Sequence, residues 1–168
     1  VLSHEECLVG LMVRGATMFP SALAYGATWN PDLIERAAEA IGREARSVGC
    51  HQGLAPVLDV SRDVRWGRTE ETFGEDPYLI GEMGAALIRG YQGQGLDDPK
   101  AVLASAKHYA GYSETQGGRD ASEADLSHRK LRSYFLPPFE RAARAGAMTF
   151  MTGYQSMDGV PSTASKWL

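Results

Sequence analysis

The chain has 168 residues, of which 43% are apolar and 23% charged, and its formal net charge is −4. These values are typical of one globular domain with a core of its own. The 17 Lys and Arg residues are spread along the chain, which argues against a nucleic-acid partner. No apolar run approaches the ~20 residues of a membrane-spanning helix, so we expect no membrane partner. The chain begins at Val1, and its sequence leaves the compartment open.

The two cysteines, Cys7 and Cys50, lie far apart in the sequence. Neither belongs to a CxxC motif or has a histidine at metal-ligand spacing, so no zinc site is predicted. We expect both to be reduced, unreactive thiols. The sequence implies no metal and no organic cofactor.

The first clear helix is predicted over residues 30–49. Asn30 can cap it, Pro31 suits its first turn, and Gly49 can end it. Apolar residues recur at helical spacing, which predicts one buried face. They are Leu33, Ile34, Ala37, Ala38, Ile41, Ala45 and Val48. The next segment, GLAPVLDV (residues 53–60), is almost wholly apolar and is predicted to be a strand covered on both sides.

A second unit repeats this alternation. Asp76 and Pro77 open a predicted helix over residues 76–92, and AVLASA (101–106) follows as a strand. A third helix is predicted over 126–146, where Pro137 and Pro138 should kink or split it. The last predicted strand is AMTFMTG (147–153).

Strands that alternate with helices imply parallel neighbours, hence an α/β fold. The sequence is compatible with a doubly wound sheet or with part of a (β/α)8 barrel. Three or four strands cannot close a barrel, which takes about 250 residues. On the barrel reading, residues 1–168 form one domain segment with an open edge on both sides. No change of composition marks a second domain.

Polar residues collect in the loops that follow the predicted strands, where α/β proteins place their sites. These loops are SRDVRWGRTEETFGEDP, KHYAGYSETQGGRD and YQSMDGVPST. In the first loop, Arg62, Asp63 and Arg65 can form local ion pairs, and they can equally face a ligand. We favour a ligand role for Arg68, because it follows a Trp-Gly bend and its guanidinium suits hydroxyls or carboxylates.

Lys107 and His108 stand where the third strand is expected to end. They can mark a strand end that reaches solvent or the mouth of a pocket. Neighbouring side chains of a strand point to opposite faces, so both can reach one pocket only where the pleat is broken. Of the polar residues that follow, most are expected to be structural, and Arg119 and Asp120 less clearly so.

Several long motifs resemble glycoside hydrolase family 3, the β-glucosidases and β-xylosidases. They are SHEECLVG, GATMFPSALAYGATWNPDL, APVLDVSRDVRWGRTEETFGEDPYL, AKHYAGY with GGRDAS, and LPPFERAARAGAMTFMTGYQSMDGVPSTASKWL. They occupy nearly the whole chain in the family's order. The resemblance implies a (β/α)8-like domain that hydrolyses terminal β-linked sugars with retention, and a small sugar or oligosaccharide as partner.

By this resemblance, Arg68, Lys107 and His108 hold hydroxyls of the terminal sugar, and Tyr154 lies near the nucleophile. Glu6 falls where relatives carry a sugar-binding acid, although the choice between Glu5 and Glu6 stays open. Val9 and Gly10 replace a His-Gly pair of many relatives, and His128 is given a structural role. The branch that acts on N-acetylglucosaminides has a different loop after its Lys-His pair and is disfavoured.

Retaining hydrolysis requires two carboxyl groups about 5 to 5.5 Å apart. In the family the nucleophilic Asp follows the SxKWL segment, and the acid/base often comes from another domain. We therefore expect neither group within this chain, and we do not expect Asp59, Glu70, Glu71 or Asp120 to replace either one. We expect the rest of its own polypeptide as a partner. Two alternatives stay open: a Schiff-base aldolase that uses Lys107, and a non-catalytic saccharide-binding or scaffold segment.

Overall fold

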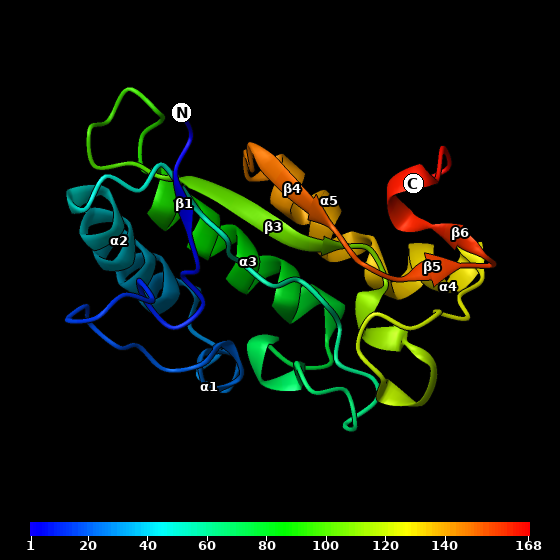
Figure 1. Cartoon of the computed structure of the whole chain (residues 1–168). Coiled ribbons are helices and arrows are strands. Elements are labelled where there is room, and N and C mark those ends of the chain that lie inside the picture. The colour runs from blue at the N-terminus through cyan, green and yellow to red at the C-terminus, as the bar shows by residue number, and fades with distance from the viewer.

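The computed structural model describes residues 1–168 as a parallel four-stranded sheet with helices on one side (Figure 1). The strands β1 (His4–Glu5), β2 (Gln52–Gly53), β3 (Leu103–Tyr109) and β4 (Thr149–Thr152) lie in sequence order. Each is parallel to its neighbour. The outer strands β1 and β4 each have one neighbour, so the sheet is an incomplete barrel wall, and the α/β prediction is confirmed.

The predicted strand at 53–60 is largely wrong as a regular strand. Only Gln52 and Gly53 join the ladder, and Val57 makes an isolated bridge to Lys107. The segment still runs along β3, because the Ala55 and Pro56 carbonyls accept bonds from the Ser105 and Lys107 amides. Pro56 has no N–H to give to a ladder, which accounts for the irregular pairing.

The first two predicted helices are confirmed, with their caps. Helix α2 spans Pro31–Ser47, and the Asn30 side chain accepts a bond from the Leu33 amide. Helix α3 spans Pro77–Gln92, and Asp76 accepts bonds from the amides of Tyr78 and Leu79. A short helix, α1 (Ala22–Gly26), precedes them. In each long helix proline takes the first position, where an N–H would have no helical partner.

The third predicted helix is split at its prolines, as expected. It consists of α4 (His128–Lys130), a π-helical turn (Leu131–Phe135) and α5 (Pro137–Arg144). Pro137 begins α5. The strand predicted at 147–153 is confirmed as β4, and a two-stranded hairpin, β5 (Ser156–Met157) and β6 (Val160–Pro161), follows it.

The core lies between the sheet and helices α2, α3 and α5, which all pack behind the strands in Figure 1. Most of α3 is buried, because α2 and α5 flank it. Gly90 allows α2 and α3 to meet closely: an added Cβ would lie 2.4 Å from the Glu35 carbonyl oxygen. Leu33 and Val48 of the predicted apolar face of α2 are exposed, so that face is narrower than its pattern indicated.

Both cysteines are buried and free, as expected. Burial is the main cause that raises the pKa of the Cys7 thiol to about 12, and it also raises the pKa of Cys50. No helix is sufficiently long and apolar to cross a bilayer.

Candidate functional site

Lys107 and His108 are buried inside β3 rather than at a strand end in solvent. The strand continues to Tyr109, and the two side chains are 1% and 3% exposed. The interpretation that this pair marks a strand end exposed to solvent is therefore wrong. The β3–β4 register shifts between Lys107 and Tyr109, so the pleat is irregular here. Both side chains can reach one site only if the pleat is broken in this way.

The Lys107 ammonium pairs with Glu6, the residue that directly follows β1. Its Nζ donates to both carboxylate oxygens, at 3.0 and 3.2 Å. The Glu6 side chain remains 43% exposed, so the ion pair has one buried and one half-open partner. Glu5, the other candidate, is exposed, so the structure places Glu6 beside Lys107.

The His108 imidazole is held by Asp59, at the end of the irregular segment beside β3. Asp59 Oδ2 lies 2.7 Å from His108 Nδ1 and 3.3 Å from the His108 backbone nitrogen. Asp59 is fully buried, and its Oδ1 has no hydrogen-bond partner in the protein. The sequence placed Asp59 at the end of an apolar run but did not identify its role beside His108.

Arg68 lies in the loop that follows Asp59, and it pairs with Glu71 three residues further along. Its Nε and Nη2 donate to the two Glu71 oxygens, both at 2.8 Å, in the fork geometry typical of Arg–carboxylate pairs. Burial alone lowers the pKa of the guanidinium, but the bonds and charge of Glu71 more than offset this and raise it. Arg68 is therefore a permanent, well-oriented cation.

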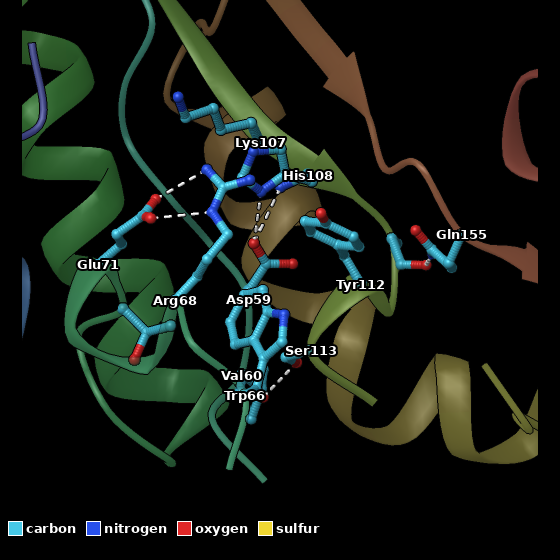
Figure 2. A network of polar contacts seen from close by, with 12 residues as sticks. Asp59, Val60, Trp66, Arg68, Glu71, Lys107, His108, Tyr112, Ser113 and Gln155 are labelled. Carbon is cyan, nitrogen blue, oxygen red and sulfur yellow. Dashed lines mark hydrogen bonds and ion pairs between the residues drawn. The ribbon is translucent and has the colours of Figure 1, made fainter. Parts of the chain in front are cut away.

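The Tyr112 ring contacts both His108 and Arg68 (Figure 2). Its ring lies 4.9 Å from the His108 ring, and the Arg68 guanidinium lies 5.6 Å from its centre. Its hydroxyl donates to Asp120, which also accepts a bond from the Trp66 indole. Burial is the main cause that raises the pKa of Tyr112, and the Asp120 bond adds to it.

The loop that contains Arg65 and Trp66 packs closely against the loop after β3 at Gly118. An added Cβ there would lie 2.8 Å from the Arg65 backbone, and Gly118 has a φ of +70°. Only glycine combines this conformation with so close an approach. Asp120, described above, thus has a structural bonding role and fixes the second loop to Trp66 of the first.

The other predicted residues lie apart from the buried pairs. Tyr154 is 73% exposed, and its ring lies 6.0 Å from that of Tyr112. Asp63 and Arg65 form an exposed local ion pair, which agrees with their structural reading, and the Arg65 bonds lower the pKa of Asp63 to about 2. His128 stacks on Trp167 at 3.9 Å, in agreement with its structural role.

A cavity of about 750 Å³ lies away from this cluster, between residues 123–128 and the β5–β6 hairpin. Its acid Glu123 binds the Ser156 hydroxyl and the Gly159 amide, so it closes the hairpin. None of Lys107, His108 and Arg68 lines this cavity. We therefore place the candidate site at these three side chains and not at this cavity.

The site thus consists of three cationic or titratable side chains, each held by its own carboxylate. The pairs are Lys107 with Glu6, His108 with Asp59, and Arg68 with Glu71. Such groups offer strong, directed hydrogen bonds to a neutral polyhydroxyl ligand. No three His, Cys, Asp or Glu side chains are grouped as metal ligands require.

Sequence reasoning missed three members of this cluster. It gave no role to Tyr112. It considered Asp59 and Glu71 as charges of the first loop and did not expect them to replace the catalytic carboxyl groups. The i,i+3 spacing of Arg68 and Glu71 was a usable signal, because side chains three apart meet on one helical turn, and residues 69–71 form such a turn. Nothing local marked Asp59 or Tyr112.

The solved structures most useful for comparison are β-glucosidases. A β-glucosidase involved in saponin metabolism from intestinal bacteria superposes with a TM-score of 0.96 and 55% identity, over 98% of this chain and 22% of that one. A β-glucosidase from Listeria innocua, solved in complex with glucose, superposes with a TM-score of 0.94 and 34% identity. That match covers 99% of this chain and 23% of the Listeria chain.

Curated relatives have similar names. A β-xylosidase from Formosa agariphila is 45% identical over 99% of this chain and 24% of its own length. A periplasmic β-glucosidase from Salmonella typhimurium is 36% identical over 90% of this chain and 20% of its own length. The chain therefore spans about a fifth to a quarter of these relatives.

The profile described as "Glycosyl hydrolase family 3 N terminal domain" matches residues 1–168, which is the whole chain. This match agrees with the parallel strands and the loop cluster at their carboxyl ends. The chain belongs to glycosyl hydrolase family 3, within the family's N-terminal domain.

Proposed function

We propose that the chain is an internal segment of a retaining β-glycosidase that removes terminal, non-reducing β-linked sugars, as a β-glucosidase does. Its own contribution is part of the subsite for the terminal sugar. Glu6, Arg68, Lys107, His108 and Tyr154 are the residues that we assign to sugar binding. The observation that carries the proposal is the approach of Arg68, from the loop after residue 60, and His108, from strand β3, to one aromatic ring, Tyr112.

The chemistry of these residues supports a sugar as the ligand. Ammonium and guanidinium groups donate to hydroxyl oxygens, and charged donors make stronger bonds than neutral ones. The carboxylates keep the cations oriented and reduce the net charge of the site, which suits a neutral substrate. Some bonds to ring hydroxyls can strengthen as the sugar becomes oxocarbenium-like.

The catalytic nucleophile and the acid/base belong, in this proposal, to parts of the polypeptide outside residues 1–168. Those parts are the principal partner of the chain, and they complete the barrel. Asp59 and Glu71 do not replace the catalytic pair, because each already binds a basic side chain of the site.

The test compares the purified chain with the complete polypeptide that contains it. We expect the complete protein to hydrolyse an aryl β-glucoside, and Lys107→Met and Arg68→Met to reduce kcat/KM by about 100-fold or more, as loss of a charged hydrogen bond to the transition state implies. We expect the isolated chain to release no product. Hydrolysis by the chain alone, or full activity of both variants, contradicts the proposal.

Two control measurements narrow the substrate and the alternatives. An aryl β-xyloside measured in parallel distinguishes a glucosidase from a xylosidase. A complete protein that binds glucose but hydrolyses neither substrate is the non-catalytic binding module. The aldolase alternative has no support here, because the Lys107 ammonium donates to both Glu6 oxygens and is not free to attack a carbonyl.

A further inference from the structure

The Asp59–His108 pair has a geometry that fixes which nitrogen of the imidazole carries the proton. Asp59 Oδ2 faces two nitrogens of the same residue, the backbone nitrogen at 3.3 Å and Nδ1 at 2.7 Å. The backbone N–H can only donate, so Oδ2 is an acceptor in that bond. With Asp59 in its carboxylate form, which can only accept, Nδ1 supplies the proton of the shorter bond.

The ring has little freedom to adopt another arrangement. The His108 side chain is 3% exposed and the Asp59 side chain 0% exposed. Tyr112 packs edge-on against the imidazole with ring centres 4.9 Å apart, which restricts rotation of its plane. Nε2, the other ring nitrogen, makes no hydrogen bond to the protein and is the one left for a ligand.

We propose that Asp59 is a positioning residue, which holds the His108 imidazole in its Nδ1–H tautomer and so makes Nε2 a hydrogen-bond acceptor toward a sugar hydroxyl. This inference rests on the proposed sugar-binding function. It also assigns donor and acceptor roles within the site: Lys107 and Arg68 can only donate hydrogen bonds, and His108 accepts one. A hydroxyl both donates and accepts, so neighbouring hydroxyls of one sugar can satisfy both kinds of group.

His51 provides an internal reference, because its Nδ1 contacts Ser3 and not a carboxylate. This Nδ1 lies 3.2 Å from the Ser3 backbone nitrogen and 2.8 Å from the Ser3 hydroxyl, which itself donates to the Gly49 carbonyl. The tautomer of His51 should therefore not depend on Asp59.

The experiment is nitrogen NMR of the 15N-labelled chain at pH 8, where an ordinary histidine is neutral. Long-range correlations between ring protons and nitrogens identify the tautomer, and His108→Gln assigns the signals. We expect Nδ1–H for His108, and the His51 signals serve as the reference that Asp59 does not affect. A preference of roughly tenfold or more is expected for His108, since the bond is to a charged acceptor.

Two variants test the role of Asp59. Asp59→Ala should abolish the preference at His108, and Asp59→Asn, which keeps the shape of the side chain, should weaken it. Neither should change the tautomer of His51. An Nε2–H tautomer or an imidazolium for wild-type His108 overturns the proposal, and so does an unchanged preference in both variants.

Addition of glucose then tests the direction of the bond. We expect the unprotonated Nε2 signal of His108 to shift while Nδ1 keeps its proton and His51 stays unchanged. If the tautomer is as expected but saturating glucose shifts no His108 nitrogen, the acceptor role toward sugar is overturned. The activity assay of the complete protein remains independent of that result, so the two failures are distinguishable.

Discussion

The ion pair of Lys107 and Glu6 should respond very differently to loss of its two partners. We consider Lys107→Met and Glu6→Met, which replace each side chain with an apolar one of similar length. The Lys107 side chain is 1% exposed, and the Glu6 side chain is 43% exposed. The charge that remains after each substitution therefore has very different access to water.

The magnitudes follow from this asymmetry. At the observed 3.0 Å and an effective dielectric constant of about 20, the gross attraction is about 5.5 kcal/mol. Glu6→Met leaves a buried ammonium without its carboxylate, and such a change costs about 3 to 5 kcal/mol. Lys107→Met removes the buried charge itself and leaves a carboxylate that water can reach, so we expect a cost below about 1 kcal/mol.

Urea denaturation of the chain without sugar, followed by circular dichroism, measures these free energies of unfolding. The double variant should recover most of the stability that Glu6→Met loses, because neither charge then remains. Equal costs for the two single variants, or a double variant no more stable than Glu6→Met, would show that burial does not govern this pair.

Three further outcomes are expected from other parts of the structure. Gly90→Ala should lower the free energy of unfolding by about 1 to 3 kcal/mol, because the added Cβ would lie 2.4 Å from the Glu35 carbonyl oxygen. Gly67→Ala is the control and should leave this free energy unchanged, because a Cβ there meets nothing within 4 Å. Asp76→Ala removes the cap of α3 and should cost about 1 kcal/mol by the same urea assay, and a cost near zero would contradict the capping role. The Cys7 thiol should resist a thiol reagent at pH 8 until urea unfolds the chain. Its folded pKa of about 12 lies above the usual value of 9.0, so its contribution to stability is present below pH 9 and is lost as the pH rises toward 12; a Cys7→Ala variant with an equally steep alkaline loss would refute this assignment.

The sequence by itself determined the elements whose causes are local. The caps Asn30 and Asp76 each bind an amide two or three residues away, and Pro137 interrupts a helix through its own ring. These contacts need no knowledge of the rest of the fold. The long loop motifs also identified the family, and with it the end of the sheet at which the polar residues collect. The irregular run at 53–60 was the exception, because Pro56 outweighed an apolar pattern typical of a strand.

Tertiary structure alone decided how the site is assembled. Arg68 and Glu71 lie 3 residues apart, so their spacing was visible in the sequence, but His108 and Asp59 are separated by 49 residues and Lys107 and Glu6 by 101. Residue spacing carries no information about partners at such separations. They meet because parallel strands bring their carboxyl ends to one edge of the sheet, and because the β3 register shift lets adjacent side chains reach different partners at that edge.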